Sequence, residues 1–210
     1  MPFTIMNESN RVKEYLIETL RQKLQNEIDA YVKRSKHSYK DAWEIITYNE
    51  IAMLSLVKSA MVRGEEATSV WALQEYEVFK EDKPQGRADL FAFYHKDGNH
   101  WTFLIEAKRD GKYNPNSKDD NNLELWETSL NDAMKQGMEY YEAEQDYFNE
   151  TSFVITMFFG TFEEGHEKDY KRPEIPPIRN GLDTAEYRFI VAPKEAPQKL
   201  CVYGQIQKVK

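Results

Sequence analysis

The chain has 210 residues, 40% of them apolar and 13% aromatic, which is enough to build the core of one ordinary domain and excludes global disorder. Its single cysteine, Cys201, excludes an internal disulfide and a multi-cysteine metal site. No apolar run approaches the roughly 18–20 residues of a membrane span, and the first residues lack the pattern of a signal peptide, so we expect a soluble, cytoplasmic protein with no membrane partner.

The net charge of −8 is distributed unevenly along the chain. Residues 65–150 carry a net charge of −11, whereas residues 1–64 carry +2 and residues 151–210 carry +1. An acidic protein is a poor non-specific binder of nucleic acid, because phosphate contacts need Lys and Arg. The charge therefore counts against a protein that coats DNA, and carboxylates gathered around a metal would explain only a small part of the excess.

Two helices are predicted first. Apolar residues at spacings of three and four predict an amphipathic helix over residues 9–35. A second helix is predicted to begin at Ser38 or Asp41 and to end near Gly64.

The pattern then changes to the alternation of strands. In chain order we expect a strand over residues 70–80, a turn over 81–86, a strand over 87–96, a hairpin turn over 97–99 and a partner strand over 100–110. A polar loop over 111–122, a helix over 123–147, a strand over 152–160, a loop over 161–184 and strands over 186–193 and 200–207 follow. This order predicts one α/β domain with helices on a mixed sheet. Residues 1–40 would be an N-terminal helical extension, 41–160 the core, and 161–210 a loop with C-terminal strands.

The stretch FLIEAKRD, residues 103–110, starts as a buried strand and then carries charges. Because side chains two residues apart share a face of a strand, Glu106 and Lys108 should lie on the face of Leu104, roughly 6.6–7 Å from each other. The intervening residues should pack under a helix. Across the predicted hairpin, Asp89 should approach Glu106 at the end of the strands that is remote from the turn.

Two carboxylates that close repel each other unless a proton or a cation lies between them. Magnesium prefers such an environment of carboxylates and water. A neighbouring lysine can orient a nucleophilic water or stabilise charge that develops on a phosphate. Asp89, Glu106 and Lys108 therefore predict a metal-dependent hydrolytic site.

The segment GRADLFAFY, the sixteen residues between Asp89 and Glu106, and the following Glu106-Ala107-Lys108 resemble the PD-(D/E)xK nuclease superfamily. Gln136 and Tyr140 match the Q-x-x-x-Y pattern of its RecB-like branch. The resemblance spans about residues 45–160. It departs from the family where Ala88 replaces the proline of the motif and where an upstream histidine has no match.

The resemblance implies a restriction-endonuclease-like core and a deoxyribonuclease that uses Mg²⁺, with Mn²⁺ as a substitute. It also implies DNA as the partner and leaves room for a homodimer, in which the first helix would be the contact surface. The same helix could equally pack on its own domain. The implied roles are metal binding by Asp89, Glu106, the Ala107 carbonyl and, directly or through water, Glu50; water positioning or charge stabilisation by Lys108; and substrate binding or bracing by Gln136, Tyr140 and Arg87.

Two alternatives remain open. The first is a nuclease-fold protein that no longer cuts and acts as a regulatory subunit, with a basic protein as its partner. This alternative is favoured by the segment 119–150, which has ten acidic residues and one lysine. The second, weaker alternative is a small-molecule hydrolase that uses the same carboxylates. Gln74 and Glu75 could line the site from the neighbouring strand, but we expect them to be ordinary strand positions.

Overall fold

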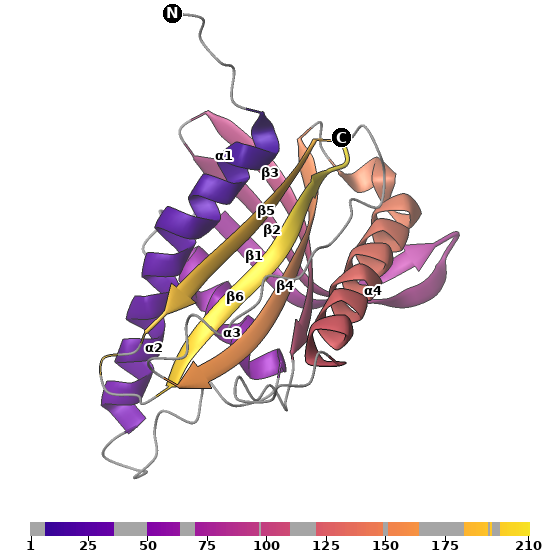
Figure 1. Cartoon of the computed structure of the whole chain (residues 1–210). Coiled ribbons are helices and arrows are strands. Elements are labelled where there is room, and N and C mark those ends of the chain that lie inside the picture. Colours follow the sequence, from indigo (N-terminus) through magenta and orange to yellow (C-terminus); the bar gives the residue numbers. More distant parts are fainter. Residues whose placement is uncertain are drawn as a thin grey trace, which may run out of the picture.

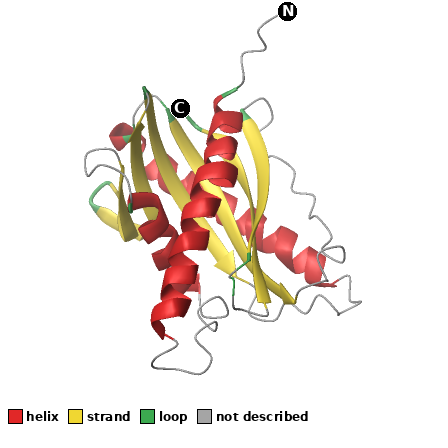
Figure 2. Cartoon of the chain, turned by 90° about the vertical axis from the view of Figure 1, so that its left-hand side faces the viewer, coloured by secondary structure: helices red, strands yellow, loops and turns green. Residues whose placement is uncertain are grey.

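A computed structural model of the chain describes residues 7–35, 50–63, 70–96, 98–109, 121–148, 151–163, 183–192, 194 and 198–210. Six strands form one sheet that lies between helices on both faces (Figures 1 and 2). The helices are α1 (Glu8–Glu14), the π-helical turn η1 (Tyr15–Leu20), α2 (Arg21–Ser35), α3 (Glu50–Val62), α4 (Asn121–Ala143) and the 3₁₀ turn η3 (Gln145–Tyr147). The strands are β1 (Val70–Lys80), β2 (Lys83–Lys96), β3 (Asn99–Arg109), β4 (Ser152–Glu163), β5 (Thr184–Val191) and β6 (Gln198–Lys208).

The sheet is mixed, as the sequence predicts. Its strand order is β1-β2-β3-β4-β6-β5, and β3 and β4 are parallel while the other neighbouring pairs are antiparallel. A parallel pair needs a crossover connection, and α4 lies in the connection between β3 and β4. The predicted order of helices and strands is therefore confirmed for the described residues. No helix among those residues is long and apolar enough to cross a membrane.

The N-terminal helix runs along one face of the sheet through α1, η1 and α2 (Figure 2). Its apolar stripe is fully buried and belongs to the same core as the sheet. Burying one such side chain contributes about 1.5–3 kcal/mol relative to leaving it in water. The helix therefore packs on its own domain, which decides between the two arrangements left open for it. The residues of the stripe are Val12, Leu16, Leu20, Leu24 and Ile28.

The two faces of the sheet have separate cores. The larger core joins α1, α2 and α3 to one face, and it contains Phe103, Ile105 and Ala107 of β3. The smaller core joins α4 to the other face, where Leu104 of β3 meets Met134 and Met138 of α4. The alternation predicted for β3 is thus confirmed.

Three predicted boundaries were wrong. The turn over 81–86 is only two residues long, because Glu81 and Asp82 both adopt left-handed backbone angles (φ 51° and 59°) that suit a tight hairpin turn. Strand β4 continues to residue 163, and α4 ends at residue 143 before η3. Some predictions lie outside the described residues: the start of the second helix, residue 97, residues 111–120 of the loop predicted over 111–122, and residues 164–182 of the loop predicted over 161–184.

Candidate active site

The sheet forks at the end of the pairing between β2 and β3. That pairing extends to Leu90 opposite Ile105. Beyond this pair, β2 continues along β1 alone, whereas β3 continues along β4 as far as Arg109. Asp89 is the first residue past the fork, and its Oδ2 accepts a hydrogen bond of 2.7 Å from the backbone N–H of Ala107. A carboxylate therefore replaces the missing strand partner, and Asp89 and Glu106 meet at the predicted end of the hairpin.

Helix α4 buries Glu106 completely. Gly137 makes the close contact possible, because a Cβ at this position would lie 2.6 Å from Cγ1 of Val154 and 3.3 Å from Cγ of Glu106. A larger residue would hold the helix away from β3 and β4. The absence of a side chain at Gly137 thus seals the Glu106 carboxyl group inside the protein.

The two oxygens of the buried Glu106 carboxyl group make no hydrogen bond of standard geometry with a residue in the described part of the chain. The Asp89 side chain nevertheless lies close enough to share a proton with this carboxyl group. The pKa of Glu106 is raised from 4.5 to about 9: burial raises it most, the neighbouring Asp89 carboxylate also raises it, and the Lys108 ammonium lowers it. Glu106 therefore holds a proton at neutral pH when no cation is bound. A bound cation would replace this proton and neutralise the ionised carboxylate.

Glu50, the first residue of α3, also lies at this end of β3. The pKa of Glu50 is raised overall, and burial is the largest cause. The Lys108 ammonium and a hydrogen bond from the backbone N–H of Arg109 lower this pKa. The Asp89 and Glu75 carboxylates raise it. Glu50 is therefore close enough to Asp89 and Lys108 to interact with their charges. Among the described residues, however, no group of three or more His, Cys, Asp or Glu side chains is arranged to hold a metal ion. The largest set of metal ligands that this geometry supports is therefore two carboxylates together with water molecules.

Glu75, which the sequence analysis expected to be an ordinary strand position, raises the pKa of Glu50 and so lies in the neighbourhood of the site. It lies on β1 between the paired positions Gln74 and Tyr76, whose partners Leu90 and Ala88 flank Asp89. Its backbone is left-handed (φ 56°) within a strand, a conformation that costs of order 1–3 kcal/mol in a residue other than glycine. Nothing in the alternation of residues 70–80 indicates this kink, because it depends on the fork in the neighbouring strands.

The remaining predicted residues have supporting positions. The amide of Gln136 donates a hydrogen bond of 3.0 Å to the hydroxyl of Tyr140, so these two residues share one face of α4 as predicted. The Tyr140 hydroxyl abuts Gly86 of β2, where an added Cβ would lie 2.3 Å away. Arg87 is exposed and approaches Glu75 at 3.9 Å. Gln136 and Tyr140 therefore brace α4 against the β1–β2 hairpin that projects past α4 in Figure 1.

No protein-family model, no curated protein sequence and no solved structure matches this chain. Its resemblance to nucleases consequently remains an expectation from the sequence motif.

Proposed function

We propose that the protein is a metal-dependent nuclease that hydrolyses DNA phosphodiester bonds at the fork of the sheet. The observation that supports this function is the approach of Asp89 to the buried carboxyl group of Glu106, which has no hydrogen bond of standard geometry, next to Lys108. Buried carboxyl groups normally make well-formed hydrogen bonds. A buried carboxyl group that lacks such a bond and lies among other charged groups is typical of functional sites. The D…ExK pattern of the sequence supplies the reaction class.

The residues at the fork fit a magnesium ion. Magnesium is usually held by one or two carboxylates and keeps several waters, and Asp89 and Glu106 provide two carboxylates. A bound cation would replace the proton that Glu106 otherwise holds. We assign Asp89, Glu106 and the Ala107 carbonyl to the metal, and Glu50 to a contact through water. When bound, the metal supplies Lewis-acid stabilisation of charge on the phosphate and lowers the pKa of water.

The other residues prepare the reaction. Lys108 carries a positive charge beside the two carboxylates, where it can orient the attacking water and stabilise charge that develops on the phosphate oxygens. The hydrogen bond from Ala107 fixes the Asp89 carboxylate. Gln136 and Tyr140 hold α4 in place over Glu106, and the exposed Arg87 is available for a phosphate of the substrate.

The test compares wild type with Lys108→Ala and with Lys135→Ala, a matched exposed lysine on α4. Each protein is incubated with single-stranded, duplex and branched DNA in Mg²⁺, Mn²⁺ or EDTA. We expect metal-dependent cleavage by wild type and by Lys135→Ala, and a loss of about 10²–10³-fold in Lys108→Ala. Equal cleavage by Lys108→Ala would refute the assignment. So would the absence of cleavage by wild type on every substrate and metal.

A second function is favoured by the outer surface of α4. Its exposed charged side chains are mostly acidic, which suits a basic protein partner better than a phosphate backbone. A catalytically inactive, regulatory protein would bind such a partner without metal and would leave all DNA substrates intact. The cleavage assay above therefore separates the two functions. The exposed acidic residues of this region are Asp132, Glu139, Glu142 and Asp146.

A further inference from the structure

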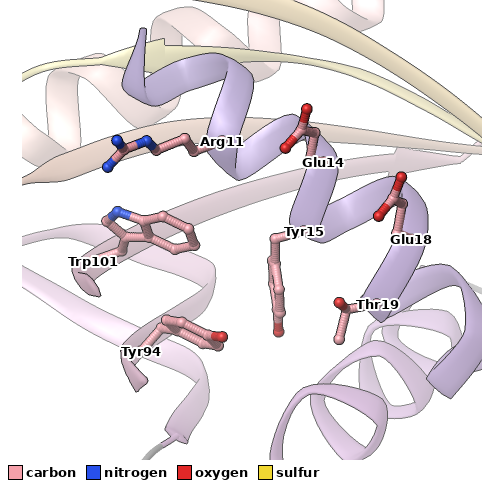
Figure 3. Close-up of a pocket in the computed structure, with 7 residues that line it drawn as sticks. All are labelled: Arg11, Glu14, Tyr15, Glu18, Thr19, Tyr94 and Trp101. Atoms are coloured by element: carbon pink, nitrogen blue, oxygen red, sulfur yellow. The ribbon is translucent and has the colours of Figure 1, made fainter. Parts of the chain in front are cut away.

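Trp71 is a large aromatic side chain that the sheet displays at its edge. It lies on the edge strand β1 and is 45% exposed. The rings of Phe91 and Phe93 on β2 lie 5.6 and 6.1 Å from its ring and hold it in place. The aromatic rings beside η1 in Figure 3 are only 5–7% exposed and belong to the buried core, so they offer a ligand no comparable surface. These rings are those of Tyr15, Tyr94 and Trp101.

An open pocket of about 550 Å³ lies beside Trp71, between β1 and the C-terminal half of α3. Its volume is in the range of sites that hold one small ligand or one unit of a polymer. Most of the surface that it offers is apolar, and Trp71 provides the exposed aromatic ring. The residues that line it are Ser55, Lys58, Ser59, Val62, Arg63, Trp71 and Ala72.

The seam between α3 and β1 leads from this pocket to the fork of the sheet. Gln74 joins the two elements, because its side-chain amide donates to the Ile51 carbonyl (3.2 Å) and its Oε1 accepts from the Ser55 hydroxyl (3.1 Å). Trp71 is paired with Phe93, four residues along β2 from Asp89, so the pocket lies roughly 13 Å from the fork. The pocket and the proposed active site are therefore two stations on one seam.

The rim of the pocket carries a cation that has no partner. The Lys58 ammonium makes no hydrogen bond or ion pair with any residue that the structure describes, whereas Arg63 is held by Glu27 at 2.7 Å. A half-exposed indole beside such a lysine suits an unpaired nucleobase, which stacks on the ring while its phosphate meets the ammonium. A duplex keeps its bases stacked on one another, so it cannot present a base face to Trp71.

We propose that Trp71 and this pocket form a nucleobase-binding subsite that selects an unpaired DNA strand for the fork. One base would stack on Trp71, its phosphate would meet Lys58, and the strand would follow the seam to Asp89. This inference rests on the proposed nuclease function, because that function gives the fork its DNA substrate. The cations along the path are few, so stacking should supply most of the affinity, as suits an acidic chain. These cations are Lys58, Arg63 and Arg87.

The test measures binding without cleavage, by fluorescence anisotropy of a labelled oligothymidylate of about 12 nucleotides in EDTA, with a duplex of the same length as the comparison. We expect wild type to prefer the single strand at least tenfold. Trp71→Ala should weaken this binding by about 5–150-fold. Trp71→Leu preserves apolar packing and should weaken it similarly, whereas Trp71→Phe retains a stacking ring and most of the affinity. Phe79→Ala, an equally exposed aromatic of β1 outside the pocket, is the matched control and should have no effect.

The salt dependence tests the part of the lysine. With at most three cations on the path, log Kd should change with log salt by a slope of about 2 or less, and Lys58→Gln should lower that slope by about 0.7. The subsite is overturned if Trp71→Leu binds as Trp71→Phe does, if the duplex binds as tightly as the single strand, or if Trp71→Leu dissociates a dimer of the free protein in sedimentation.

The same assay separates this inference from the nuclease itself. A wild type that binds the single strand through Trp71 but cuts no DNA supports the subsite and removes the proposed nuclease function. Metal-dependent cleavage by wild type, together with equal binding of the single strand by wild type and Trp71→Leu, keeps the nuclease and overturns the subsite.

Discussion

The buried carboxyl group of Glu106 gives a prediction about stability that requires no substrate. In the absence of metal, Glu106→Gln should make the protein more stable at neutral and alkaline pH, although it removes a group that the nuclease needs. A glutamine keeps the shape of the protonated side chain, and its amide can donate to the Asp89 carboxylate. It also removes the cost of protonating a carboxyl group that ionises freely in the unfolded chain.

The magnitude follows from the pKa of Glu106, which is raised from 4.5 to about 9, mainly by burial and then by the Asp89 carboxylate. Between these values the folded state holds a proton that the unfolded state has lost, so the free energy of unfolding falls as the pH rises. One pKa unit corresponds to about 1.36 kcal/mol, and pH 7 lies 2.5 units above 4.5, which gives an upper bound of about 3 kcal/mol. At pH 5 the same term is less than about 1 kcal/mol. The stabilisation by Glu106→Gln should therefore grow between pH 5 and pH 8.

Urea denaturation, followed by circular dichroism at pH 5, 6, 7 and 8 in EDTA, measures this difference. The control is Glu139→Gln, which changes an exposed glutamate of α4, the helix that covers Glu106, and should follow wild type at every pH. Added Mg²⁺ should stabilise wild type increasingly as the pH rises and should leave Glu106→Gln unchanged, because the ion competes with the proton on the carboxylate. Parallel pH profiles for wild type and Glu106→Gln in EDTA would show that Glu106 is ionised or satisfied, and would refute the reasoning.

Three further variants examine the fork and the helix above it. Asp89→Asn retains an acceptor for the Ala107 N–H and should unfold within about 1 kcal/mol of wild type, whereas Asp89→Ala leaves that N–H without its partner and should cost about 1–3 kcal/mol; both should lose metal binding by calorimetry. Equal stability of the two variants would contradict a structural role for the hydrogen bond. Gly137→Ala places a Cβ 2.6 Å from Val154 and should lower stability by about 1–3 kcal/mol, despite the better helix propensity of alanine, and a thermal melt that matches or exceeds wild type would contradict the close packing of α4.

Local sequence patterns determined much of the fold of this protein. The alternation of Phe103, Leu104 and Ile105 with the charged residues that follow fixed which side chains of β3 share a face, because the two-residue period of a strand allows no other assignment. The hairpin before this strand set the approach of Asp89 to Glu106, since antiparallel pairing proceeds residue by residue from the turn. The order of elements followed from the same periods.

Tertiary structure decided the features that depend on segments far apart in the chain. The fork beside Asp89 arises because β2 and β3 follow different neighbours, and the left-handed Glu75 accompanies it. The complete burial of the Glu106 carboxyl group depends on how closely α4 approaches at Gly137, and a residue pattern carries no measure of that distance. The π-helical turn at Tyr15 is likewise set by what the helix packs against, because its sequence fits a continuous α-helix equally well.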